Sequence, residues 1–174
     1  MASDKDELVF LPLGGLGEIG MNAALYGFGP KKKKKWILVD CGVTFADESQ
    51  PGIDLILPDL RFIEERKEDL VGIIITHAHE DHIGAITELW PRLEAPVYMT
   101  RFAADLLATR RLSEPGAPKL PVTVVPQGGR IALGPFDVQF IPVSHSIPES
   151  NSLAIRTAHG LVVHTGDWKL DDAP

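Results

Sequence analysis

The sequence predicts an α/β fold with mixed β-sheets. Short apolar runs typical of strands outnumber the segments with helical periodicity. These runs gather toward both ends of the chain, which differs from the regular strand–helix alternation of a fully parallel sheet. The chain has 174 residues and an apolar fraction of 44%, enough for one domain with a sizeable core.

The N-terminal part is expected to form strands at 8–13, 22–28 and 36–41. The last two are predicted to form a hairpin with Gly27, Gly29, Pro30 and the lysines at 31–35 in its turn. This lysine run is either a solvated hairpin tip, which is favoured, or a phosphate-contacting patch. The net charge of −7 argues against nonspecific binding of nucleic acid by the chain as a whole.

Residues 15–20 match the G-x-G-x-x-G pattern of a dinucleotide-binding turn, with Asp40 twenty positions after the third glycine. A Rossmann unit needs a helix directly after that glycine. Residues 20–30 instead contain further glycines and a proline without a helical stripe. We therefore predict a hairpin here and reject a nicotinamide cofactor.

The middle of the chain mixes both kinds of element, and its C-terminal part is again rich in strands. Helices are predicted at 59–67, 82–90 and 101–112, the last with Phe102, Ala103, Leu106 and Leu107 on one face. The remaining strands are predicted at 71–76, 96–99, 121–125, 130–133, 136–142, 151–157 and 161–165.

Residues 77–82 carry the clearest chemical signal, the pattern H-x-H-x-D-H directly after an apolar run. Imidazole and carboxylate groups are ligands that transition metals prefer. Residues two apart in an extended loop point the same way, so His77 and His79 can bind one ion. Asp81 falls where a helix can begin and His82 points elsewhere. One segment can therefore supply two adjacent metal positions.

Two further candidates, His145 and Asp167, follow predicted strands and suit the same sheet edge. We expect one ion at His77, His79 and His145, a second at Asp81 and His82, and Asp167 as the bridge between them. Two divalent ions about 3.5–4 Å apart lower the pKa of a shared water and stabilise the attacking and leaving oxygens of a hydrolysis. Asp81 could orient or deprotonate that water.

Other polar residues are expected to support this site or to have structural roles. Asp40, at a strand end, is predicted to orient the ligands through hydrogen bonds. His164 is expected to pack or to serve behind the ligands, and His159 to lie in a turn. Cys41 is the only cysteine, so an internal disulfide is excluded and a reducing compartment is favoured.

The motif and its flanks resemble the ribonuclease J family of β-CASP nucleases, which belongs to the metallo-β-lactamase superfamily. The resembling segments are residues 11–22, 39–42, 52–59, 75–85, 144–150 and 164–169. The resemblance implies an αββα sandwich of two mixed sheets flanked by helices, with the metal site on one edge. By this resemblance the metal ligands are His77, His79, Asp81, His82, His145 and Asp167.

The resemblance also implies a function. Such enzymes are cytoplasmic, hold two divalent ions (zinc, or manganese as the alternative), and act in RNA maturation and decay as endonucleases and 5′–3′ exonucleases. The implied partner is single-stranded RNA with a 5′-monophosphate, no membrane is involved, and the full-length protein is expected to be a homo-oligomer. Ser144, Ser146 and Ser150 are either contacts near the scissile phosphate or turn-forming hydroxyls.

Members of that family are much longer than this chain. Residues 1–174 are therefore expected to be the N-terminal part of a metallo-β-lactamase domain, without the β-CASP and C-terminal regions and possessing little or no nuclease activity of its own. An incomplete second sheet should then leave an apolar face and an open strand edge. Two other functions stay open: a small-molecule hydrolase of the thioesterase or lactonase type, and a non-catalytic binding protein. No signal peptide or membrane span is predicted.

Overall fold

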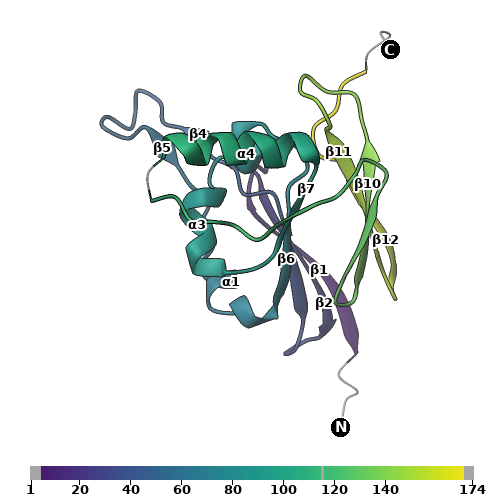
Figure 1. Ribbon diagram of the computed structural model, residues 1–174. Helices are drawn as coiled ribbons and strands as arrows, with labels where there is room; N and C mark the ends of the chain where they lie inside the picture. Colours follow the sequence, from purple (N-terminus) through teal and green to yellow (C-terminus); the bar gives the residue numbers. More distant parts are fainter. Residues whose placement is uncertain (1–4, 115, 171–174) are drawn as a thin grey trace.

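The computed structural model describes residues 5–114 and 116–170 and shows two β-sheets packed face to face, with helices on the outer face of one of them (Figure 1). The first sheet has the strand order β1-β2-β3-β6-β7-β8, and the second has the order β12-β11-β10-β9. The first sheet is mixed, because β1, β2 and β3 pair antiparallel whereas β3, β6, β7 and β8 pair in parallel. The predicted α/β class with mixed sheets is confirmed.

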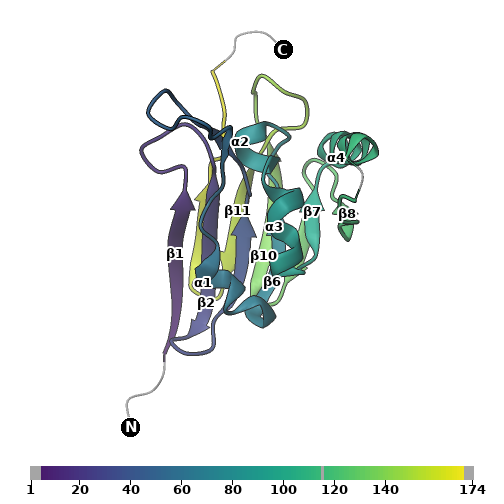
Figure 2. The ribbon, with the colours of Figure 1, turned by 90° about the vertical axis from the view of Figure 1, so that its left-hand side faces the viewer.

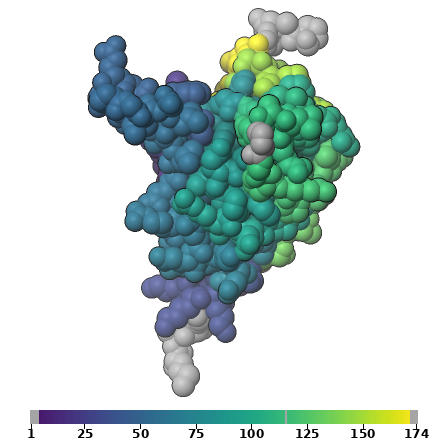
Figure 3. All heavy atoms as spheres, turned by 60° about the vertical axis from the view of Figure 1, so that its left-hand side comes forward, coloured from purple at the N-terminus to yellow at the C-terminus, as the bar shows by residue number. Residues whose placement is uncertain are grey.

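The strands follow the predicted apolar runs closely. In the first sheet they are β1 (Asp6–Gly14), β2 (Ala23–Pro30), β3 (Lys35–Val39), β6 (Leu70–Ile74), β7 (Val97–Met99) and β8 (Val122–Val124). In the second sheet they are β9 (Arg130–Leu133), β10 (Phe136–Pro142), β11 (Asn151–Thr157) and β12 (Gly160–His164). A two-stranded ribbon, β4 (Thr44–Phe45) and β5 (Leu55–Ile56), was not predicted, because its strands are too short to show periodicity. Figure 3 shows the segment that carries it projecting from the body.

The core has two layers. One lies between the first sheet and the helices and includes Leu38, Ile73 and Ile86. The other lies between the two sheets and includes Phe136 and Phe140. Burying the apolar area of such side chains is the main force that holds sheets and helices together.

The helices are α1 (Arg61–Glu64), η1 (Lys67–Asp69), α2 (Glu80–Ile83), α3 (Ile86–Leu93) and α4 (Arg101–Ser113). The helix predicted at 82–90 is broken into α2 and α3, because the Ala85 amide donates to the Cys41 carbonyl rather than to its own helix. The helix predicted at 59–67 is reduced to one turn, followed by the 3-10 helix η1. Only α4 comes within one residue of its predicted range.

The glycine-rich segment behaves as predicted in one respect and differs in another. No helix follows Gly20, and β2 and β3 form the expected hairpin. Gly27, however, lies inside β2 opposite Trp36, where a Cβ atom would come within 2.5 Å of the indole ring. It is therefore needed for close packing and not for the turn.

The lysine run forms the turn between β2 and β3, at the end of the sheet opposite α2 (Figure 2). Lys34 is buried and pairs with Glu7 at 2.8 Å, and Lys35 pairs with Asp69 at 2.8 Å. Two of the five lysines thus hold neighbouring segments together, which differs from a fully solvated tip.

The second sheet has an open edge at β12, where Leu161 and Val163 are 50% and 54% exposed. Among the described residues no helix covers the outer face of this sheet (Figure 1). The expected exposed apolar edge is therefore present. No helix of the described residues is long and apolar enough to cross a membrane.

Candidate metal centre

The candidate ligands lie where several strands end at one edge of the sandwich. Asp40 follows β3, and residues 75–79 follow its parallel neighbour β6. The carboxyl ends of parallel strands commonly form ligand sites, because loops from neighbouring strands meet there. From the second sheet, His145 follows β10 and Asp167 follows β12.

A first group of ligand atoms comes from three histidines, His77, His79 and His145. Nδ1 of His79 lies 3.1 Å from Nε2 of His77 and 3.1 Å from Nε2 of His145. Metal–nitrogen bonds of about 2.0–2.1 Å place neighbouring ligand atoms of a tetrahedral site roughly 3.4 Å apart. The three rings are therefore spaced to hold one ion.

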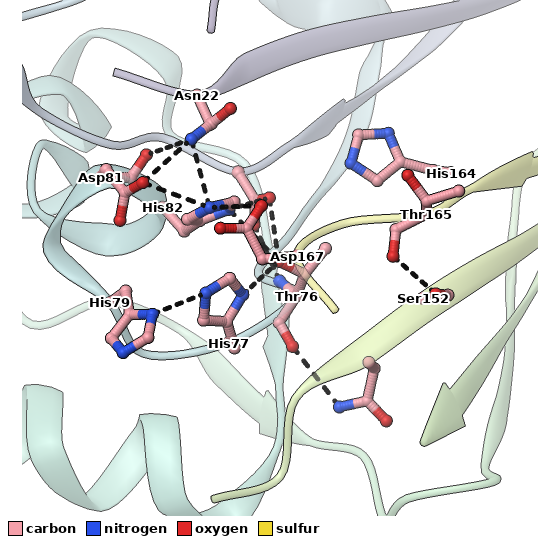
Figure 4. Close-up of polar contacts among 12 residues, drawn as sticks. Asn22, Thr76, His77, His79, Asp81, His82, Ser152, His164, Thr165 and Asp167 are labelled. Carbon is pink, nitrogen blue, oxygen red and sulfur yellow. Dashed lines mark hydrogen bonds and ion pairs between the residues drawn. The ribbon is translucent and has the colours of Figure 1, made fainter. Parts of the chain in front are cut away.

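A second group consists of His77, His82 and Asp167. Oδ1 of Asp167 lies 3.4 Å from Nε2 of His82, and its Oδ2 lies 3.8 Å from Nε2 of His145. The Asp167 carboxylate thus faces ligands of both groups, as Figure 4 shows for His77 and His82.

Asp81 lies beside this second group without being a member of it. Its Oδ2 is 3.5 Å from Nε2 of His82, and Nδ2 of Asn22 lies 3.4 Å from the same oxygen (Figure 4). Asn22 Nδ2 is also 3.1 Å from Nε2 of His82. The expected pairing of Asp81 with His82 is present as a contact, whereas His77 takes the third position of the group.

Asp40 lies behind the ligands and is 1% exposed. It accepts hydrogen bonds from the Thr76 amide at 2.8 Å and the Thr76 hydroxyl at 2.9 Å. Its Oδ2 also lies 2.8 Å from Nδ1 of His82. Burial by itself raises the pKa of the Asp40 carboxyl, but the His82 imidazole and the Thr76 amide together lower this pKa below its ordinary value.

The histidines differ in their affinity for protons. Burial, followed by the neighbouring His82, lowers the pKa of His77 to about 3, so this ring is neutral and its nitrogen lone pair is free to bind a metal. Burial also acts to lower the pKa of His82, but Asp40 and Asp167 raise it to about 10. The hydrogen bond from His82 is the main cause that lowers the pKa of Asp167 to about 2.

A cavity of about 310 Å³ opens beside the second group, between β1 and β12. Phe10, Tyr26, Asn22 and His164 contribute to its walls. The Tyr26 hydroxyl and Nδ1 of His164 are 3.0 Å apart, so His164 is placed behind the ligands and is not in either ligand group. Burial raises the pKa of Tyr26 to about 12.

The three candidate serines occupy different environments. Ser144 and Ser146 are exposed, in the loop that carries His145. Ser150 is 1% exposed, and its hydroxyl donates to the Ile147 carbonyl at 3.3 Å. Ser150 therefore corresponds to the turn-forming alternative, and its burial argues against a substrate contact. His159 lies in the β11–β12 turn, as predicted, with its ring against Phe28.

Sequence reasoning missed two residues that contact the candidate ligands and one in the loop beside them. Thr76 connects Asp40 to Nδ1 of His77 through its hydroxyl, and its position next to the motif was a signal that could have revealed it. Asn22 has no local signal, because it contacts His82 from 60 positions away in the chain. Glu149 belongs to the loop of His145, but its contact with the Phe102 amide of α4 spans 47 positions and has no local signal either.

Known proteins are similar to this chain in sequence and in fold. A profile described as "Metallo-beta-lactamase superfamily" matches residues 21–168. Ribonuclease J of Sinorhizobium meliloti is 55% identical over 174 residues, covering 100% of this chain and 31% of that protein. Ribonuclease J of Helicobacter pylori is 38% identical, covering 99% of this chain and 24% of that protein. The chain thus spans less than a third of these curated relatives.

Solved structures agree on the fold. The metallo-beta-lactamase fold protein YhfI from Bacillus subtilis superposes with a TM-score of 0.63 and 21% identity, covering 97% of this chain and 66% of that one. The metallo hydrolase Igni18 from Ignicoccus hospitalis gives a TM-score of 0.56 and 20% identity, covering 94% of this chain and 64% of that one. At this identity the likeness concerns the fold alone.

Proposed function

The chain belongs to the metallo-β-lactamase superfamily, and on that premise we propose that it supplies the metal site of a ribonuclease that hydrolyses RNA phosphodiesters. The observation that carries the proposal is the 55% identity with a ribonuclease J across the whole chain. Residues 1–174 would then be the N-terminal part of the metallo-β-lactamase domain in a cytoplasmic, homo-oligomeric protein of the relatives' length. The proposed substrate is single-stranded RNA with a 5′-monophosphate.

Two divalent ions fit the donor set. His77, His79 and His145 would hold one ion, and His82 and Asp167 would hold the second with Asp81 beside them. The histidine-rich group favours zinc, whereas a group with carboxylates also accepts manganese. When bound, such ions supply a water of lowered pKa and positive charge near the phosphodiester oxygens.

The protein's own residues have separate tasks in this proposal. Asp81 is partly exposed beside the second group and would orient the attacking water or accept its proton. Asp40 and Thr76 hold the rings of His77 and His82 in place, because their hydrogen bonds occupy Nδ1 of each ring and leave Nε2 toward the site. Asp167 faces both groups and would bridge them.

The test is cleavage of end-labelled RNA by a protein of the relatives' length that contains this chain. Zinc or manganese is supplied, and RNA with a 5′-monophosphate is compared with RNA carrying a 5′-triphosphate. Asp81→Ala and His77→Ala should abolish cleavage while the protein stays folded, and His159→Ala should cleave like the wild type. Intact RNA together with rapid hydrolysis of a thioester or lactone would overturn the proposal and favour the small-molecule hydrolase.

A further inference from the structure

Helix α4 runs between the two loops that carry the first ligand group. It is the longest helix among the described residues and lies across the end of the sandwich where these loops meet (Figure 1). Its first turn approaches the loop of His145, and its last turns approach the motif at 77–82. None of the residues in this helix is a candidate ligand.

The N-terminus of α4 is capped from a distant part of the chain. Thr100 occupies the N-cap position without a side-chain hydrogen bond, and the first turn contains no acidic residue. The Phe102 amide instead donates to Oε2 of Glu149 at 2.8 Å, across 47 positions. A carboxylate at this position satisfies an unpaired amide and complements the positive end of the helix dipole.

Glu149 is itself part of the loop that carries His145. Its backbone φ of 58° lies in the left-handed region, which is unfavourable for a residue with a Cβ atom and must be compensated by surrounding contacts. Its carbonyl accepts from Nδ2 of Asn151 at 2.5 Å, and the same nitrogen lies 3.4 Å from the Thr76 carbonyl. The conformation of this loop is thus coupled both to α4 and to the residue before His77.

The other end of α4 contacts the motif. Arg110 forms an ion pair with Glu80, the residue between His79 and Asp81. Both side chains are partly buried. Through Glu149 and Arg110, one rigid helix therefore contacts the loops of His145 and of His79.

We propose that helix α4 holds the loops of His145 and His79 at a fixed separation, a role that we call the brace. Glu149 and Arg110 are the positioning residues that set the distance of His145 from His79. The proposal rests on the proposed metal site but not on RNA as the substrate. Residues outside the ligand shell commonly change metal affinity about 10- to 100-fold when they are removed.

The test is titration with Co²⁺ of a metal-free protein of the relatives' length that contains this chain. Binding is followed by the visible absorption of the ion, and stability by thermal unfolding. Glu149→Ala should weaken Co²⁺ binding about tenfold and alter the absorption spectrum. Glu149→Gln keeps an accepting oxygen without the charge and should lose less. Arg110→Ala should weaken binding about two- to fivefold, as expected for a partly exposed ion pair.

Two variants are matched controls. Glu94 also has a left-handed backbone and an ion pair, with Lys67, but touches neither ligand loop. Arg111 neighbours Arg110 without contacting Glu80 in the described structure. Glu94→Ala and Arg111→Ala should bind Co²⁺ like the wild type.

A double variant separates positioning from simple stabilisation of the helix. Arg101→Glu adds a carboxylate at an exposed position in the first turn of α4, although it also removes the ion pair of Arg101 with Asp105. Combined with Glu149→Ala, it should recover part of the thermal stability without recovering Co²⁺ affinity. Recovery of both thermal stability and Co²⁺ affinity in the double variant would overturn the brace. Wild-type Co²⁺ affinity together with a wild-type absorption spectrum in Glu149→Ala would overturn it as well.

Two further results have a defined meaning. If Glu149→Ala does not fold, Arg110→Ala decides by the same comparison, and wild-type affinity and spectrum in that variant overturn the brace. A wild-type chain that binds no Co²⁺ overturns the metal site itself. Normal Co²⁺ binding by every variant overturns the brace alone.

Discussion

Oδ2 of Asp40 lies 2.8 Å from Nδ1 of His82, although 42 positions separate the two residues in the chain. The same carboxylate accepts two hydrogen bonds from Thr76, so it joins the ends of β3 and β6 to the first turn of α2. A buried carboxylate with these partners fixes the orientation of the imidazole, because it holds one ring nitrogen and leaves the other toward the ligand group.

Asp40→Asn should therefore weaken metal binding while leaving the fold largely intact. The neutral amide cannot accept all three hydrogen bonds as the carboxylate does, so we expect at least about a tenfold loss of metal affinity. The free energy of unfolding should fall by about 1–3 kcal/mol, because buried polar groups lose partners. Chelator competition and denaturant unfolding measure the two effects. Asp137→Asn, in the other sheet, serves as the control, and an equal loss there would contradict the assigned role.

Gly42→Ala should disturb the motif directly. A Cβ atom at Gly42 would lie 1.7 Å from the Asp81 carbonyl oxygen and 2.6 Å from the His82 amide nitrogen. The chain must shift, at a cost of about 1–3 kcal/mol in the free energy of unfolding, and metal affinity should fall with it. Gly52→Ala is the control, because that position is open although its backbone is left-handed. Wild-type metal binding in Gly42→Ala would show that the loop can adapt.

The His145→Ala variant should bind less metal per chain than the His159→Ala variant. His145 contributes a nitrogen to the three-histidine group, whereas His159 lies in a turn against Phe28. Elemental analysis after dialysis should find at least one zinc or manganese ion fewer per chain in His145→Ala than in the wild type. Equal metal content in the two variants would remove His145 from the ligand set.

The stability of the chain should decrease in alkaline solution, in part because of Cys41. Burial, followed by the nearby Asp40, raises the pKa of this thiol. The unfolded thiol ionises above pH about 8.5 whereas the folded one stays protonated, so the unfolded state binds fewer protons and stability falls as pH rises. For this group the loss approaches about 1.4 kcal/mol per pH unit. Urea unfolding between pH 8 and 10 should show a shallower decline in Cys41→Ala, and an unchanged decline would exclude the thiol as its cause.

Much of the fold is visible in the sequence because its signals are local. The apolar runs predicted every strand of the two main sheets, but not β4 and β5, and helix α4 differs from its predicted range by one residue. The failures have long-range causes. The predicted helix at 82–90 is interrupted because the Ala85 amide bonds to Cys41, and Gly27 looked like a turn residue because its contact with Trp36 is made across two strands.

The sequence by itself predicted the candidate ligand side chains. Three histidines and an aspartate follow one strand, and His145 and Asp167 follow two others, so their positions at strand ends bring them to one edge. Tertiary structure alone decided how they combine: His77 faces both groups, Asp81 lies beside the second, and Glu149 reaches from the His145 loop to the start of α4. The physical reason is that periodicity depends on neighbours in the chain, whereas ligand spacing depends on how two sheets and a helix pack together.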